Sequence, residues 1–300
     1  MKYRHSYHAG NFADVHKHVV LLALLRALKR KEKGFAYFET HAGRGVYDLP
    51  RAGSQSADGA RRPSAGGKQA AGAGPGESAA GADVVAEGEF RSAELQHYTA
   101  RLAEFRAAMG RPRAYPGSPV LAAEELRPQD RAILCEWLPA EARMLERELE
   151  RYPRCRVEPG DGFERLRAWL PPPERRGLIL IDPPYEDSKR DFERVTATVC
   201  DALRRFNTAV IAAWYPIKDE RDTRHWRESF ARAVSAETLA SELWLYPRDS
   251  QVALNGSGLL IVNPPWKLEE CMREWLPELW ARLDTGHAGG TSVTKLTRAA

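Results

Sequence analysis

Short apolar runs alternate with helical patterns along most of the chain, and this alternation predicts the fold class. The run at 177–181 is apolar at its interior positions, as expected of a central strand in a parallel sheet. Other strand-like runs lie at 35–40, 131–138, 155–158, 208–214 and 258–262, with helical patterns at 139–151, 163–170, 188–206, 219–234 and 266–283. The pattern predicts an α/β fold with a doubly wound, mostly parallel sheet, which binds ligands at the carboxyl ends of its strands.

Residues 51–88 interrupt the alternation. These 38 residues contain nine Gly and eleven Ala, and their larger aliphatic residues are Val84 and Val85. Such a composition cannot bury enough apolar surface to offset the entropy lost on ordering, so we predict a flexible surface insertion. Apolar residues at helical spacing then predict a helical insertion at 89–112. We expect one domain over residues 1–300, with a C-terminal tail at 284–300.

Composition and charge narrow the class of protein. Hydrophobic residues make up 43% of the 300 residues and charged residues 29%, which excludes global disorder. The formal charge of +4 permits a polyanionic partner without requiring one. The longest apolar run, 19–25, is far shorter than the ~20 residues of a bilayer span, so we predict a cytoplasmic protein whose first helix is amphipathic. The four cysteines are widely spaced and are predicted to be buried free thiols.

Polar residues follow three successive predicted strands. The first loop holds Gly43 and Gly45 but lacks the third glycine of a dinucleotide fingerprint, so it is either a structural turn or a close approach to a nucleoside. Glu136 could accept hydrogen bonds from ribose hydroxyls or be an exposed carboxylate. Asp161 lies between two glycines and could contact a ligand or cap a helix. Their succession favours a cofactor that carries a nucleoside.

The loop after strand 177–181 is the most specific signal. Asp182, Pro183, Pro184 and Tyr185 follow one another there. Strand termination alone explains the prolines, but not the acid before them or the aromatic residue after them. The Asp182 carboxylate and the Pro183 carbonyl could each accept one hydrogen of an exocyclic amine, and Tyr185 could stack on a base with about 1–3 kcal/mol. This arrangement suits methyl transfer to an amino nitrogen from a sulfonium cofactor.

A second copy of the motif, Asn263-Pro264-Pro265-Trp266, ends a late strand. We expect that strand near the edge of the sheet, away from the three cofactor loops, and we interpret this copy as structural. The four histidines at positions 5, 8, 16 and 18 lack the carboxylate or cysteine that would complete a recognisable metal site, so we predict no metal.

Several blocks in one order resemble the 23S ribosomal RNA adenine-N6 methyltransferase family. They are Tyr3–Asn11 with Lys17-His18, Thr40–Gly43, Tyr115–Pro119, Asp161-Gly162, Gly177–Tyr185 and Asn263–Glu269. The resemblance covers nearly the whole chain except 51–88 and the C-terminal tail, and this chain has Leu138 where the family often has a histidine. It implies a class I methyltransferase with a Rossmann-like fold, S-adenosyl-L-methionine as cofactor, and an adenine of 23S rRNA as substrate.

The resemblance also implies roles for individual residues. Residues expected around the cofactor are Lys17, His18, His41, Gly43, Ser118, Glu136, Asp161, Gly162 and Asp182. Asp182 is expected to be catalytic, together with Pro183 and Tyr185. Tyr3, His5 and Tyr185 are expected to contact the substrate.

Other functions remain open on the sequence. A DNA adenine or protein glutamine amino-methyltransferase would use a similar turn, and a non-enzymatic RNA-binding assembly factor could keep the fold. The basic run at 29–33 could contact phosphate or be an ordinary solvated helix face. We expect a monomer that acts on 23S rRNA before subunit assembly is complete, on an adenine that is unpaired or extruded.

Overall fold

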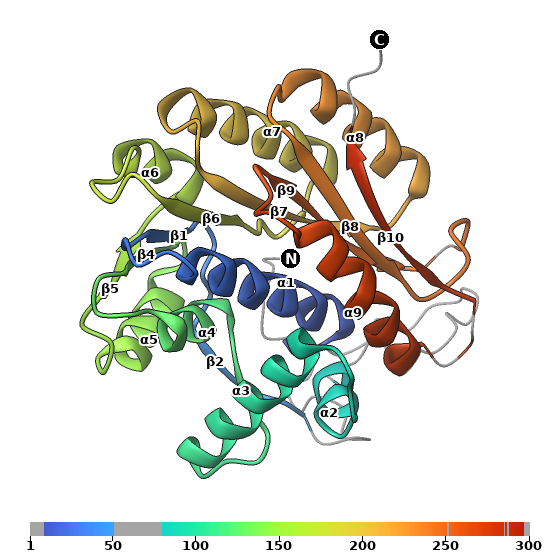
Figure 1. Ribbon diagram of the computed structural model, residues 1–300, viewed down its shortest axis with the longest axis horizontal. Coiled ribbons are helices and arrows are strands. Elements are labelled where there is room, and N and C mark those ends of the chain that lie inside the picture. Colours follow the sequence, from blue (N-terminus) through green and yellow to red (C-terminus); the bar gives the residue numbers. More distant parts are fainter. Residues whose placement is uncertain (1–8, 51–79, 251, 285, 287, 297–300) are drawn as a thin grey trace, which may run out of the picture.

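The computed structural model describes residues 9–50, 80–250, 252–284, 286 and 288–296, and within them a central sheet is covered by helices on both faces (Figure 1). The eight strands of this sheet have the order β10-β8-β9-β7-β6-β1-β4-β5. Their bounds are β1 Ala36–Glu39, β4 Arg131–Glu136, β5 Cys155–Pro159, β6 Gly177–Ile181, β7 Val210–Ile217, β8 Thr238–Trp244, β9 Gly256–Val262 and β10 Gly290–Leu296. A separate two-stranded sheet pairs β2 (Val46–Asp48) with β3 (Ala114–Pro116).

The helices form two layers around the central sheet (Figure 1). One core cluster joins the sheet to α1 (Phe12–Lys29), α4 (Ser118–Glu125), α5 (Pro139–Leu149) and α9 (Leu268–Leu283). The other joins the opposite face to α6 (Gly162–Trp169), α7 (Ser188–Arg205) and α8 (Glu220–Ala233). No helix in the described part of the chain is long and apolar enough to cross a bilayer.

The strand directions confirm the predicted α/β class. Strands β5, β4, β1, β6 and β7 pair in parallel, whereas β9 pairs antiparallel with β7 and β8, and β10 antiparallel with β8. The predicted tail at 284–300 is wrong for 290–296, because these residues form β10 along the whole length of β8. In β10 only Val293 is fully buried, so this edge strand has a weak apolar signal in the sequence.

Helix α1 is buried on nearly all sides, so the prediction of an amphipathic first helix is wrong. Its inner side packs on the sheet, and α2 (Ala80–Ala86), α3 (Ala93–Met109) and α9 cover other sides. Even His16 is fully buried, and its two ring nitrogens lie 3.0 Å from the hydroxyls of Ser241 and Ser257. Burial lowers the pKa of His16 to about 3, so the ring is neutral at pH 7.

The insertion contributes two helices to this cover. The predicted helix at 89–112 is confirmed as α3, whose apolar side is buried and which ends at Gly110 in the left-handed conformation. The prediction of a flexible 51–88 is wrong at its end, because α2 packs on α1; residues 51–79 lie outside the described residues. A Cβ at Gly81 would lie 2.7 Å from the Phe12 nitrogen, so this close contact depends on the small residue.

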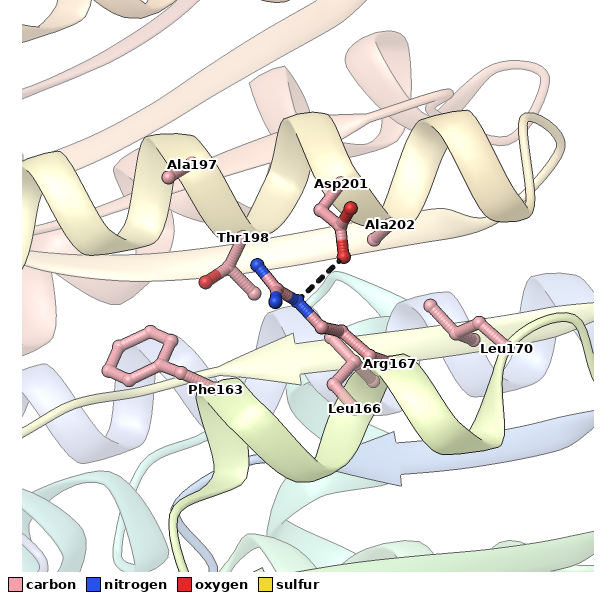
Figure 2. Close-up of a pocket in the computed structure, with 8 residues that line it drawn as sticks. All are labelled: Phe163, Leu166, Arg167, Leu170, Ala197, Thr198, Asp201 and Ala202. Carbon is pink, nitrogen blue, oxygen red and sulfur yellow. Dashed lines mark ion pairs between the residues drawn. The ribbon is translucent and has the colours of Figure 1, made fainter.

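Between α6 and α7 lies a small cavity of about 40 Å³ (Figure 2). Leu166 of α6 and Leu170, which follows the helix, line the cavity, and Arg167 forms an ion pair of 3.0 Å with Asp201 (Figure 2). The volume suffices for a water molecule and is far below the ~300 Å³ at which ligand sites begin. We therefore interpret this cavity as a packing gap between two helices.

The four cysteines are free thiols, as predicted. Only Cys135 is fully buried; Cys155, Cys200 and Cys271 are partly exposed, which corrects the prediction that all four are buried.

Candidate active site

A pocket of about 400 Å³ opens at the carboxyl ends of β1, β4, β5 and β6. This is the edge at which a doubly wound sheet binds ligands, and the volume is within the range of small-molecule sites. The pocket brings together seven of the predicted site residues: His41, Gly43, Glu136, Asp161, Gly162, Asp182 and Pro183. The loops after four strands therefore meet at one site, as their positions in the sequence predicted.

Glu136 joins the loops after β4 and β1. One carboxylate oxygen accepts a hydrogen bond from the Gly43 backbone N–H at 2.8 Å, and the other accepts one from the Leu138 N–H at 2.7 Å. Burial raises the pKa of this carboxyl from its ordinary value. Each carboxylate oxygen has two lone pairs, so Glu136 keeps the capacity to accept hydrogen bonds from two hydroxyl groups of a ligand.

Asp161 caps α6 and also faces the pocket. It accepts a hydrogen bond of 2.9 Å from the Phe163 N–H and one of 2.7 Å from Arg194. The capping role predicted from the sequence is confirmed, and the position of Asp161 in the pocket lining leaves it able to contact a ligand. At Gly162 a Cβ would lie 1.9 Å from the Thr40 carbonyl oxygen, so only glycine allows α6 to approach the β1 loop this closely.

His41 lines the pocket beside Phe163. Its ring packs edge-on against Phe163, with ring centroids 4.8 Å apart, and its Nδ1 lies 2.8 Å from the Thr40 hydroxyl. Burial lowers the pKa of His41 to about 4, so the ring is neutral at pH 7 and offers an apolar face with one polar edge.

Asp182 lies at the base of the pocket, directly after β6. Lys17 of α1 donates hydrogen bonds to Asp182 Oδ2 at 2.6 Å and to Asp14 Oδ1 at 2.8 Å. Burial alone would lower the pKa of Lys17, but the two carboxylates outweigh burial and raise it above its ordinary value. Lys17 is 3% exposed and does not line the pocket, so its contact with the pocket runs through Asp182.

Two predicted cofactor residues lie behind the pocket wall. The Ser118 hydroxyl donates to Glu39, which also accepts a hydrogen bond of 2.9 Å from Tyr37. His18 Nδ1 lies 2.8 Å from the Tyr115 hydroxyl. Neither Ser118 nor His18 lines the pocket, so the structure does not bring them into direct contact with its interior.

Tyr185 does not offer the predicted stacking face. Its backbone is left-handed, with φ 50°, and this turns the side chain into the core, where it is 2% exposed. The hydroxyl donates to the Trp214 carbonyl at 2.6 Å, and the ring packs against Phe192 with centroids 5.2 Å apart. In this conformation Tyr185 anchors the Asp-Pro-Pro turn and leaves the pocket lined by Pro183 and Pro184.

The remaining predicted residues lie elsewhere. Tyr3 and His5 are outside the described residues. The second motif is not near a sheet edge, because β9 lies between β7 and β8; since β9 runs antiparallel to β7, Asn263 lies at the opposite end of the strands from Asp182. In the described ranges, no group of three or more His, Cys, Asp or Glu could hold a metal ion.

Several lining residues were missed from the sequence. Trp137, which is 61% exposed, and Leu138 follow Glu136 and could have been found from their place at a strand end. Arg44 forms an ion pair of 2.7 Å with Glu141, and Arg194 reaches the pocket from α7; neither carries a local signal. Among the described residues, the lining contains two arginines and six carboxylates, namely Glu136, Glu141, Asp161, Asp182, Glu186 and Asp191.

Comparison with known proteins identifies the family. A sequence model described as "Ribosomal RNA large subunit methyltransferase D, RlmJ" matches residues 32–297. Ribosomal RNA large subunit methyltransferase J of Escherichia coli is 38% identical over 291 residues, covering 96% of this chain and 97% of the relative. The protein of that name from Haemophilus influenzae is 35% identical, covering 99% of both chains.

A solved structure agrees with this relationship. The crystal structure of protein LPL1258 from Legionella pneumophila has a TM-score of 0.77 and 31% identity, and the match covers 98% of this chain and all of that chain. The chain that carries this pocket at its strand ends therefore belongs to the family of ribosomal RNA large subunit methyltransferase D, RlmJ.

Proposed function

We propose that this protein transfers a methyl group from S-adenosyl-L-methionine to the exocyclic N6 of an adenine in 23S rRNA. The observation that carries the proposal is the Asp182-Pro183-Pro184 turn, which lines the same pocket as Glu136 and Asp161 in a member of a ribosomal RNA methyltransferase family. The curated relatives are named as large-subunit rRNA methyltransferases, which supports rRNA over DNA or a protein as substrate.

The pocket fits the cofactor. Glu136 can accept hydrogen bonds from ribose hydroxyls, and Gly43 and Gly162 line the pocket close to the strand ends. His41 and Phe163 supply flat apolar surface beside Asp161. When bound, S-adenosyl-L-methionine supplies the electrophilic methyl group of its sulfonium. The protein contributes proximity and orientation.

Asp182 holds the nucleophile. In the transfer, N6 would bond to the methyl carbon, the bond from that carbon to sulfur would break, and the proton released from N6 would pass to the Asp182 carboxylate. Asp182 can accept an N6 hydrogen because the Lys17 contact at Oδ2 leaves lone pairs on both of its oxygens. The Pro183 carbonyl can accept the second hydrogen, which aligns the nitrogen lone pair with the methyl group.

The substrate adenine must leave any RNA helix to reach Asp182, since that side chain is only 6% exposed within the pocket lining. This favours rRNA that is still accessible, before subunit assembly is complete. We propose that the protein acts as a monomer in the cytoplasm, with Tyr3 and His5 near the target nucleotide.

The test compares four methyl acceptors in parallel. Wild-type protein and labelled S-adenosyl-L-methionine are incubated with protein-free 23S rRNA, assembled large subunits, duplex DNA and a release-factor protein. We expect N6-methyladenine in 23S rRNA, and more in the protein-free RNA than in subunits. Label found only in DNA or in protein would refute the assignment.

Asp182→Ala tests the catalytic role. We expect transfer to be abolished while calorimetry shows cofactor binding largely retained, with Asp182→Asn as a second variant that preserves shape. Asn263→Ala is the matched variant from the second motif and should keep kcat at saturating RNA, because Asn263 binds backbone carbonyls at the opposite end of the strands from Asp182. Undiminished turnover in both Asp182 variants would instead assign catalysis to another residue.

A further inference from the structure

The catalytic pocket is poorly suited to attract a polyanion. Six carboxylates and two guanidinium groups line it among the described residues, and each guanidinium is paired with a carboxylate. RNA affinity comes largely from basic side chains that neutralise phosphates. If the protein binds rRNA, other surfaces must supply most of that electrostatic attraction.

A second groove, of about 510 Å³, lies at the opposite end of the strands. It is formed where α1 ends, at the first residues of β6 and β7, Gly177 and Val210, and at the second Pro-Pro motif (elements in Figure 1). Four basic side chains line it, and its lining includes no acidic residue within the described part of the chain; the four are Arg30, Lys31, Arg175 and Arg176. The basic run 29–33 therefore forms part of a shaped surface.

Trp266 projects from the wall of this groove. Its side chain is 76% exposed, and the Lys267 ammonium lies 4.5 Å from the centroid of its ring. At that distance the ammonium is attracted to the electron-rich face of the ring, so the contact adds one more positive charge beside Trp266. An exposed tryptophan amid basic side chains is the combination by which proteins bind single-stranded nucleic acid, because bases stack on the ring and phosphates contact the cations.

The backbone holds this loop firmly. The Asn263 amide donates hydrogen bonds to the carbonyls of Asn207 and Ala209 at 2.9 and 2.8 Å. Asn263 and Lys267 both have left-handed backbones, with φ of 52° and 64°, so the turn around Pro264 and Pro265 is fixed at both ends. On the facing wall, Arg176 donates at 2.7 Å to the Leu28 carbonyl and so secures the end of α1.

We propose that this groove binds a single-stranded segment of the substrate RNA, with a base stacked on Trp266 and phosphates contacted by Arg30, Lys31 and Arg175. This inference rests on the proposed function for the identity of the RNA. The groove and Asp182 lie at opposite ends of β6, about 16 Å apart along a five-residue strand. The RNA segment bound in the groove therefore does not include the target nucleotide. The groove contributes affinity for the RNA, while Asp182 contributes the chemistry.

The first experiment measures binding by fluorescence anisotropy. The probe is a fluorescein-labelled, unstructured single-stranded RNA of about 20 nucleotides. Trp266→Ala should bind about 5- to 160-fold more weakly, as for loss of one stacked base, and Trp266→Phe should recover part of the affinity. In Arg30→Ala/Lys31→Ala, the slope of log affinity against log salt should fall by about 1.4.

The matched control is Arg143→Ala/Met144→Ala on α5, which removes an exposed arginine and a 40% exposed apolar side chain away from the groove. It should bind RNA as the wild type does. Thermal unfolding of each variant checks that it is folded. Because Trp266 is exposed, Trp266→Ala should unfold at the same temperature as the wild type. If the groove variants bind the probe as tightly as the control does, the proposal is overturned, and a protein partner becomes the alternative occupant of the groove.

The second experiment separates this inference from the proposed function. With 23S rRNA as substrate, Trp266→Ala should raise KM by the same factor as it weakens binding and leave kcat unchanged. A fall in kcat at unchanged KM would contradict an anchoring role. If wild-type protein does not methylate 23S rRNA, the proposed function fails, whereas the anisotropy comparison still decides whether the groove binds RNA.

Discussion

Replacing Lys17 with methionine tests how the catalytic carboxylate is held in place. Lys17, Asp14 and Asp182 are all less than 10% exposed, and the ammonium contacts both carboxylates at 2.8 Å or less. Lys17→Met leaves two buried carboxylates without their cation. Removing one partner of a buried ion pair costs about 3–5 kcal/mol. For a chain of 300 residues this corresponds to a fall in Tm of about 5–8 °C.

The assay is thermal or urea unfolding at pH 7.5. The two carboxylates raise the pKa of Lys17 above its ordinary value, so the ammonium is fully charged at this pH and its contribution to stability is fully present; it is lost only as the pH rises through that raised pKa. Arg26→Met on the same helix is the control, because its ion pair with Glu94 spans 3.7 Å and is partly exposed. We expect that variant to lose less than about 1 kcal/mol.

A double variant tests whether the loss of stability comes from the two buried carboxylates. Adding Asp14→Asn to Lys17→Met removes one of the two carboxylates that lost the Lys17 ammonium and should recover part of the lost stability. Activity should stay low in both variants, because Asp182 still lacks the hydrogen bond that positions it. A Lys17→Met protein as stable as Arg26→Met, or a double variant less stable than the single one, would show that the buried ammonium does not hold these carboxylates.

Two further predictions follow from the pocket. Gly162→Ala should cost about 1–3 kcal/mol in unfolding free energy and weaken cofactor binding in calorimetry, because its Cβ would collide with the Thr40 carbonyl; Gly286→Ala, with open space around its Cβ, is the control, and equal stability of the two would refute the argument. Burial raises the pKa of Glu39 to about 8, so between pH 5 and 8 the native state keeps a proton that the unfolded state loses, and wild-type stability falls as the pH rises. Glu39→Gln lacks this titration, so denaturation from pH 5 to 9 should show its stability relative to the wild type increasing with pH; a constant difference would contradict it.

The strand-end residues could be predicted because their signal is local. The apolar run of β6 identifies a central parallel strand, and the position directly after it places Asp182 at the ligand edge. The same reasoning places Glu136 at the carboxyl end of β4 and Asp161 after β5. Periodicity alone thus fixes which end of the sheet carries chemistry, provided that the strands are parallel.

The direction of individual strands and the burial of individual side chains could not be predicted in the same way. The antiparallel course of β9 depends on its pairing with β7 and β8, and β8 itself was not identified from the sequence. Burial of Lys17 depends on residues 165 positions away, since Asp182 is its partner. Tyr185 turns inward because of a left-handed backbone that no residue type in the motif reveals.

The burial of α1 has a consequence for how the chain folds as it is synthesised. The helix leaves the ribosome early, but the hydroxyl partners of His16 lie 225 and 241 residues further along the chain. At about 5–20 residues per second, β8 and β9 appear roughly 10–45 s later. During that interval the side of α1 that packs on β9 has no partner strand, and only the contacts with earlier elements such as α3 and α4 are available to cover the helix.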